Sequence, residues 1–183
     1  MAWMEKTKFW RRMGAMLNTG TGAAVNKVTG DLVNRVTAAA MTPRLSGDVP
    51  WTAPTKPLAE SAVALVSTAG FHLRNDEPFD VDAQLGDPSY RSFPKDVRTN
   101  DLVVSHTHYP HRYVDADVNV LLPIDRLREL ESAGALRVAP RVFSFGFAGT
   151  ITREIVDPEA GTAHTLAEEL KVDQVDLMLL VPA

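Results

Sequence analysis

Ala62-Val63-Ala64-Leu65-Val66 decides the fold class, because this short apolar run leads directly into Ser67-Thr68-Ala69-Gly70. Such a run, bounded by small and polar residues, is typical of a buried strand that feeds a loop. Further apolar runs at Leu102–Val104 and Gln174–Val181 alternate with a helical repeat over residues 124–130. We therefore predict an α/β fold with a mostly parallel sheet flanked by helices.

The remaining elements of this fold are expected from weaker patterns. Further strands are predicted at Val118–Leu122, Leu136–Val138 and Arg141–Phe147, and a short helix at Thr165–Lys171. Residues 74–100 are polar and show little periodicity, so we expect them to form one long loop, which in a compact domain usually has a function. The apolarity of the last run, at residues 174–181, is that of a central strand.

The first 50 residues differ from the rest of the chain. Residues 1–12 carry four basic side chains against one acidic side chain, and residues 23–41 have helical spacing. Proline residues then predict an extended connector. We divide the chain into an N-terminal helical extension and linker at residues 1–50 and an α/β domain at residues 51–183. The basic segment is either a leading helix packed on the body or an amphipathic segment that touches a partner or a membrane surface.

Composition excludes several classes of protein. The chain has 183 residues, 45% of them hydrophobic, with a net charge of −4 and no cysteine. A negative net charge argues against nucleic-acid binding, and the longest apolar-leaning stretch, Ser61–Leu73, is too short for a transmembrane segment. Without cysteine the 183 residues hold no disulfide, thiolate metal site or cysteine nucleophile, which fits a cytoplasmic protein.

Three of the five histidines lie within Ser105-His106-Thr107-His108-Tyr109-Pro110-His111. Strand spacing would place the imidazoles of His106 and His108 on one side, and Pro110 would let His111 turn back toward them. Three imidazoles with an open fourth position are a catalytic arrangement for a divalent metal such as zinc or iron. Asp115 follows closely enough to join such a metal site.

The same histidines have two metal-free interpretations. They would serve as acid–base or substrate-binding groups, or they would only order the loop. The pattern differs from the His-x-His-x-Asp-His of the metallo-β-lactamase superfamily, since Pro110 stands at the aspartate position and cannot bind a metal. Two function classes stay open: a metal-dependent hydrolase or lyase, and a non-catalytic ligand-binding subunit.

Four other residues are candidates for substrate binding. Arg91 ends a turn at residues 86–91, where its guanidinium would hold a substrate carboxylate through two hydrogen bonds, or would simply be solvated. His72 follows the first strand, where a ligand-facing loop belongs. Asp117 and Asn119 lie just beyond the histidines.

Six stretches of the chain share their order and spacing with one known family. They are Ala64–Leu73 (ALVSTAGFHL), Glu77–Asp80 (EPFD), Gly86–Arg91 (GDPSYR), Ser105–Tyr109 (SHTHY), Asp117–Val120 (DVNV) and Pro123–Leu130 (PIDRLREL). They resemble the selenoprotein B family of the glycine, sarcosine, betaine and D-proline reductases. The resemblance runs from about Pro54 to Ala183.

This resemblance implies a reductase that cleaves the C–N bond of an amino acid or of an N-methylated amino acid. In such reductases a selenolate or thiolate attacks the α-carbon and displaces the amine, and a redox partner subunit completes the reduction. We expect an oligomer that binds an amino-acid-like small molecule.

The nucleophile of that family is a selenocysteine or cysteine on the C-terminal side of a strand resembling Val175–Pro182, and this chain has neither. We therefore hypothesise that the sequence is truncated at a selenocysteine codon that was read as a stop. An in-frame continuation beyond codon 183 with nearby cysteine codons would support this hypothesis, and a different stop codon without a continuing frame would refute it.

Overall fold

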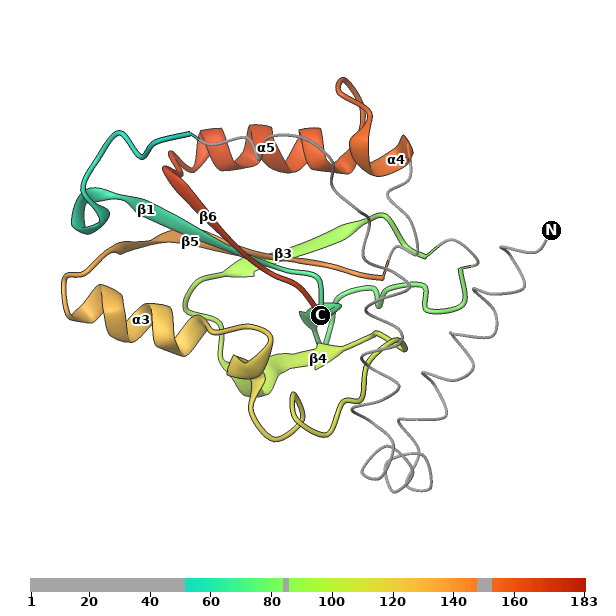
Figure 1. The fold of residues 1–183 in the computed structure, drawn as a ribbon. Helices are drawn as coiled ribbons and strands as arrows, with labels where there is room; N and C mark the ends of the chain where they lie inside the picture. Colours follow the sequence, from blue (N-terminus) through green and yellow to red (C-terminus); the bar gives the residue numbers. More distant parts are fainter. Residues whose placement is uncertain (1–51, 84–85, 148–152) are drawn as a thin grey trace, which may run out of the picture.

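A computed structural model describes residues 52–83, 86–147 and 153–183. These residues form a central sheet with helices on both faces (Figure 1), as predicted for an α/β fold. The predicted N-terminal helical extension at residues 1–50 lies outside the described residues.

The central sheet is built around β1 (Ala62–Ser67). On one side β1 pairs in parallel with β5 (Arg137–Phe145), and on the other it pairs in parallel with β6 (Leu177–Val181). The edge strand β3 (Tyr90–Pro94) runs antiparallel to β5, which gives the order β3-β5-β1-β6. Three of the four strands are thus parallel to one another, which confirms the predicted sheet type.

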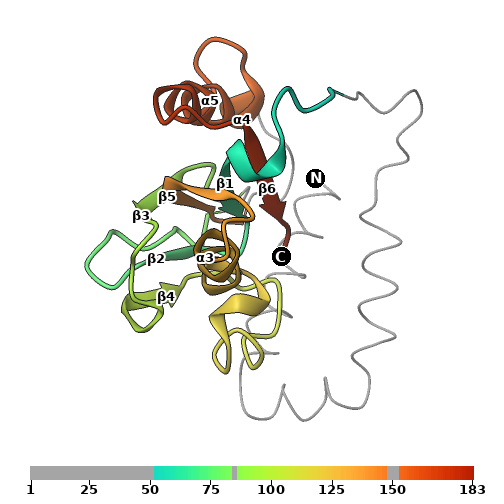
Figure 2. The same ribbon diagram turned by 90° about the vertical axis from the view of Figure 1, so that its left-hand side faces the viewer.

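A second sheet has two antiparallel strands, β2 (Phe71–Leu73) and β4 (Leu102–Val104). It lies on the same side of the central sheet as α3 (Ile124–Ser132), whereas α5 (Thr162–Val172) covers the opposite face (Figure 2). The short α4 (Arg153–Val156) precedes α5. Three 3-10 turns complete the described elements: η1 (Leu58–Glu60), η2 (Thr99–Asp101) and η3 (Val118–Val120).

Alternating side chains of the central strands supply the two halves of the core. Leu65 and Val142 pack with Leu127 of α3, while Val66 and Phe143 pack with Leu166 of α5. Successive residues of a strand point to opposite faces, so one apolar run can fill both layers. For this reason the run at residues 62–66 has no polar position.

Three expected elements differ from the structure. Val118–Leu122 is not a strand, because the side chain of Asp117 accepts a hydrogen bond from the backbone of Asn119 and begins the 3-10 turn η3. The strands predicted at Leu136–Val138 and Arg141–Phe147 are one strand, β5, whose pairing with β1 shifts register around Pro140. The predicted loop at residues 74–100 contains β3.

The last strand, β6, is an edge strand and not a central one. Its apolar side chains Met178, Leu179 and Leu180 are exposed. Apolarity alone does not separate a central strand from an uncovered edge. In the described parts of the chain, no helix has the length and apolarity needed to cross a membrane.

Candidate functional site

The histidine segment packs on the loop at the carboxyl end of β1. The hydroxyl of Tyr109 donates a hydrogen bond to the carbonyl oxygen of Ala69 at 2.8 Å, and Gly70 accepts one from the backbone N–H of Ser105 at 2.9 Å. Burial, followed by the negative charge of Asp115, raises the pKa of Tyr109, so its phenol keeps the proton that it donates. The carboxyl ends of parallel strands are where α/β proteins place their ligands.

His106 is the buried centre of this segment, with 5% of its surface exposed. Its Nδ1 accepts a hydrogen bond from the backbone N–H of His108 at 3.1 Å, so the ring proton of the neutral form sits on Nε2. Burial, together with the charges of His108 and His111, lowers the pKa of His106 to about 3. The imidazole is therefore neutral at physiological pH and cannot serve as a cationic anchor for an anion.

The other two histidines face different partners. The ring of His108 stacks on Phe147, with centroids 3.4 Å apart, and His111 donates from Nε2 to the carbonyl oxygen of His106 at 2.7 Å. The strand spacing expected for His106 and His108 is absent, because β4 ends at Val104, before both residues. Their rings nevertheless lie close together, with centroids 5.7 Å apart, and both contact Phe147.

These contacts bear on the predicted zinc or iron. Among residues 52–83, 86–147 and 153–183, no group of three or more His, Cys, Asp or Glu side chains is arranged to hold a metal ion. The predicted ligands His106, His108, His111 and Asp115 are thus not assembled into a metal site there. The geometry gives the metal prediction no support, and the zinc or iron stays a prediction.

Arg91 holds a loop against β3. Its Nε donates to the carbonyl oxygen of Glu77 at 2.9 Å, and its guanidinium lies 4.5 Å above the ring of Phe79. A further contact joins the guanidinium to the hydroxyl of Ser89 at 2.8 Å. These protein contacts already occupy several of its donors. Its role as an anchor for a substrate carboxylate stays a prediction.

Replacing Arg91 with alanine is expected to lower the free energy of unfolding by about 1.5 kcal/mol, because it removes a cation–π contact and charge-assisted hydrogen bonds. Arg126→Ala is the control, because Arg126 is 61% exposed in a helix-surface ion pair, and it should change stability by less than about 0.5 kcal/mol. Urea unfolding measures both. Equal, negligible losses would contradict the structural role of Arg91.

Asp117 and Asn119 are tied to the start of α3. The amide of Asn119 donates to Asp117 and Asp125, and its oxygen accepts the backbone N–H of Asp125, each at 3.0 Å. Hydrogen bonds from Asn119 lower the pKa of Asp117. This network caps the first turn of the helix. The substrate-binding role expected for both residues stays a prediction.

His72 and Ser105 form a hydrogen-bonded pair at the small sheet. Nδ1 of His72 lies 2.8 Å from the carbonyl oxygen of Leu73, and Nε2 lies 2.9 Å from Oγ of Ser105. Sequence reasoning did not single out Ser105. No pattern in the sequence points to Ser105, because its position depends on strand pairing: His72 lies opposite Val103, and Ser105 comes two residues after Val103.

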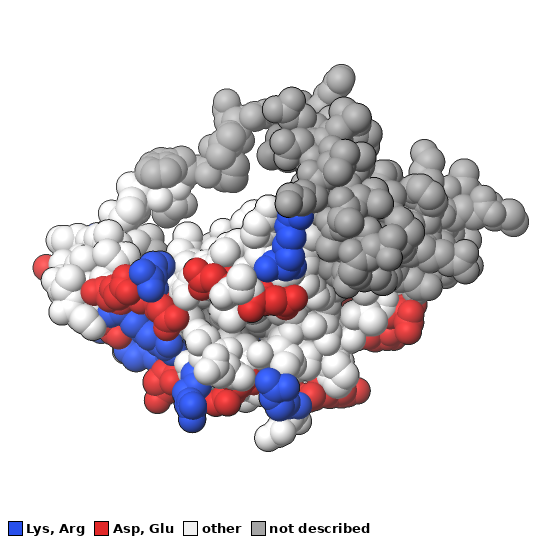
Figure 3. Space-filling model, turned by 90° about the horizontal axis from the view of Figure 1, so that it is seen from below, with Lys and Arg blue, Asp and Glu red and all other residues white. Residues whose placement is uncertain are grey.

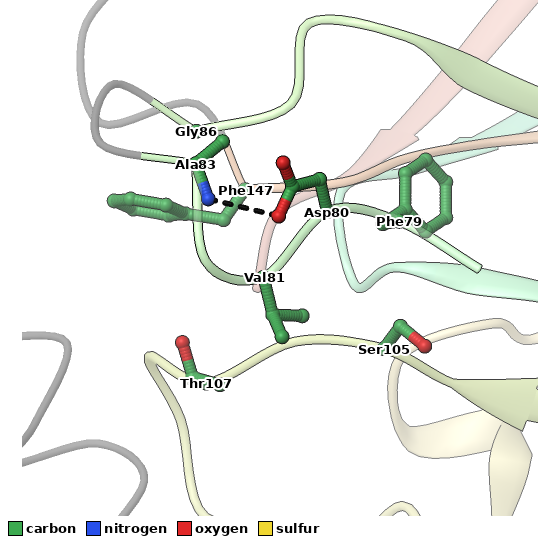
Figure 4. A pocket seen from close by; sticks show the side chains of 8 residues that line it. All are labelled: Phe79, Asp80, Val81, Ala83, Gly86, Ser105, Thr107 and Phe147. Atoms are coloured by element: carbon green, nitrogen blue, oxygen red, sulfur yellow. Dashed lines mark hydrogen bonds between the residues drawn. The ribbon is translucent and has the colours of Figure 1, made fainter.

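A small pocket opens beside this pair. Ser105 and Thr107 form one wall, and Phe79, Asp80 and Val81 form another (Figure 4). Phe147, which stacks on His108, also lines it. The pocket therefore joins the histidine segment to the loop that Arg91 holds in place.

The face that carries α3 has charges of both signs. Basic and acidic side chains are interspersed on it (Figure 3). Two ion pairs involve α3: Lys95 with Glu131 and Arg128 with Asp125.

Comparison with known proteins gives a family and two curated relatives. The sequence profile described as "Glycine/sarcosine/betaine reductase selenoprotein B (GRDB)" matches residues 15–183. The match begins at residue 15, well before Pro54, where the resemblance was expected to begin, so the family similarity also covers residues 15–53. No solved structure matches the chain.

The first relative is the D-proline reductase subunit gamma of Acetoanaerobium sticklandii, 36% identical over 131 residues, which cover 71% of this chain and 52% of the relative. The second is the glycine reductase complex component B subunit gamma of Symbiobacterium thermophilum, 27% identical over 137 residues, which cover 72% of this chain and 30% of the relative. The chain thus spans about half, or less, of the length of these relatives. Because the family profile matches nearly the whole sequence, the chain belongs to the glycine/sarcosine/betaine reductase selenoprotein B family.

Proposed function

We propose that this chain is the substrate-holding part of an amino-acid reductase that cleaves the bond between the α-carbon and nitrogen. The observation that carries the proposal is the family match over residues 15–183. Both curated relatives are named as reductase subunits, one for D-proline and one for glycine. A reaction driven by thiols or selenols suits the reducing cytoplasm, where we place the protein.

The proposed reaction is a two-electron reduction. A chalcogenolate attacks the α-carbon, the C–N bond breaks, and the amine leaves with a proton. A dithiol then supplies two electrons, releases the carbon product with a C–H bond and becomes a disulfide. The 183 residues contain no cysteine, so the nucleophile has to come from outside them. A redox partner subunit in an oligomeric assembly would supply the electrons.

The residues of this chain would position the substrate near the carboxyl end of β1. Thr68 lies there beside β6, accepting a hydrogen bond from the backbone of Ala183 at 2.9 Å. Neutral His106 and protonated Tyr109 support the same loop. Arg91 or backbone N–H groups would hold the carboxylate of the amino acid. A nucleophile delivered next to this loop would then reach the α-carbon of that amino acid.

Amine release by the intact assembly tests the proposal. A tagged copy of the chain is purified without oxygen, with its natural partners, and given a dithiol and one candidate substrate. Breaking the C–N bond yields ammonia from glycine, methylamine from sarcosine, trimethylamine from betaine and 5-aminopentanoate from D-proline. We expect one of these products, formed only with the dithiol.

Two variants serve this assay. His106→Gln should slow product formation at least about tenfold, which corresponds to 1.4 kcal/mol of transition-state free energy. His164→Gln on α5 changes a histidine outside the proposed site and should leave the rate unchanged. Equal rates for both variants would show that His106 has no role in the reaction. Binding of a candidate substrate without any product would indicate a ligand-binding subunit.

A further inference from the structure

The edge strand β6 carries exposed apolar side chains on both of its faces. Among the described residues it pairs only with β1, at the edge of the sheet opposite to β3 (Figure 2). Met178, Leu179 and Leu180 are 51%, 40% and 52% exposed. Leu177 and Val181 pack partly against the core on the side of α3. Because side chains alternate along a strand, Leu179 shares their face, whereas Met178 and Leu180 lie on the face of α5.

This strand lacks the features that usually keep an edge from pairing. Residues Leu177–Val181 contain no charge and no proline. The carbonyl oxygen of Val181 points toward β1, since it accepts the backbone N–H of Thr68 at 3.1 Å. Backbone groups alternate in direction along a strand, so those of Met178 and Leu180 point away from β1. An uncharged apolar edge with outward backbone groups is a template for a further strand.

The sequence of β6 is complementary to a second copy of itself. Two-fold antiparallel pairing centred on Leu179 would place Met178 opposite Leu180 of the second copy. The same pairing would place Leu177 opposite Val181 of the second copy. Only apolar side chains would then meet on either face of the joined strands.

The charges beside β6 favour this antiparallel direction. Asp176, the residue before β6, forms an ion pair with Lys56 at 2.7 Å and lies 3.9 Å from Arg137. In the antiparallel pairing Asp176 would stand opposite Pro182 of the second copy, which is uncharged. Parallel pairing in register would instead set the same charged groups of both copies side by side, which costs free energy.

We propose that two copies of this chain pair through β6, with the two strands antiparallel and Leu179 on the two-fold axis. The two four-stranded sheets then form one continuous sheet, in which each copy covers the exposed edge of the other. Because the strands are antiparallel, the carboxyl ends of β1 in the two copies face opposite ways, and both candidate sites stay open. The pairing rests on β6 alone and does not depend on the proposed C–N cleavage.

Analytical ultracentrifugation of the full chain tests the proposal, and we expect an equilibrium between monomer and dimer. Leu180→Lys should weaken the dimer at least about tenfold, because it places a cation among apolar side chains. Val156→Lys on α4 is the matched control, since Val156 is 54% exposed, and it should leave the dimer unchanged. A full chain that stays monomeric, or equal dimerisation by Leu180→Lys and the unmodified chain, would overturn the proposal. A monomer would leave β6 to a strand of another subunit.

A cysteine on the two-fold axis tests the register directly, because the chain has no cysteine of its own. In the proposed pairing residue 179 faces its own copy in a non-hydrogen-bonded pair, with Cα atoms about 4.5 Å apart, which a disulfide can bridge. Leu179→Cys should therefore form a disulfide-linked dimer on mild oxidation, seen by non-reducing electrophoresis.

Met178→Cys is the matched control for this cross-link. The two copies of residue 178 would stand diagonally across the pair, roughly 7–8 Å apart, which is too far for a disulfide. We expect little cross-linking of this variant. Equal cross-linking of Met178→Cys and Leu179→Cys, or no cross-linking of Leu179→Cys, would contradict the proposed pairing.

Discussion

Replacing Gly70 with alanine is expected to lower the free energy of unfolding by about 3 kcal/mol. Gly70 has a φ of +75°, and an added Cβ would stand 2.5 Å from the carbonyl oxygen of Ser105. The substitution thus combines a left-handed backbone with a collision that moves the histidine segment. Thermal unfolding should show a midpoint lower by roughly 6–12 °C.

Gly134→Ala separates these two causes. Gly134 has a φ of +72°, nearly that of Gly70, but nothing lies within 4 Å of an added Cβ. This variant should lose only the backbone part, about 1 kcal/mol. If both alanine variants lost the same free energy of unfolding, the close approach of Gly70 to Ser105 would make no contribution to the loss.

Acidification is expected to remove about 3 kcal/mol of stability between pH 6.5 and about pH 4, through His106 alone. Burial lowers the pKa of His106 from 6.5 to about 3 in the folded protein. Between these two values the unfolded chain binds a proton that the folded chain does not, so stability falls as the pH falls. Carboxylates with lowered pKa add to the loss only near and below their ordinary values, which are 3.8 for Asp87 and 4.5 for Glu131.

His106→Gln tests this assignment. Glutamine has no proton to gain in this range, and its amide oxygen can accept the backbone N–H of His108. Urea unfolding at several pH values should show a slope of about 1.4 kcal/mol per pH unit for the unmodified protein, well above that of His106→Gln. His164→Gln on α5, away from His106, is the control and should keep the slope. Parallel curves for the unmodified protein and His106→Gln would show that another group causes the acid sensitivity.

The parts of the fold that sequence predicted are those with a strong local pattern. The run at residues 62–66 is buried on both faces and became β1, and the helical repeat at 124–130 became α3. The strand predicted at residues 118–122 does not form, because the side chain of Asp117 accepts a backbone hydrogen bond there and begins a 3-10 turn. β3 was missed because an edge strand bonded on one side needs little apolar patterning.

The site was predictable as a region but not as a set of contacts. The sequence placed the histidine segment directly after the strand at Leu102–Val104, whereas its packing on the loop that follows β1 is known only from the structure. Its ring orientations depend on tertiary partners such as Phe147, which is distant in sequence. The pairing of His72 with Ser105 likewise arises from the register of β2 and β4, which no local pattern encodes.

The central claim is that this chain works in an assembly that reduces the C–N bond of an amino acid. The most direct measurement is the product formed by the purified assembly with and without a dithiol: ammonia from glycine, methylamine from sarcosine, trimethylamine from betaine or 5-aminopentanoate from D-proline. We predict one of these four products, formed in proportion to the dithiol consumed. An active dithiol supply with none of the four products would contradict it.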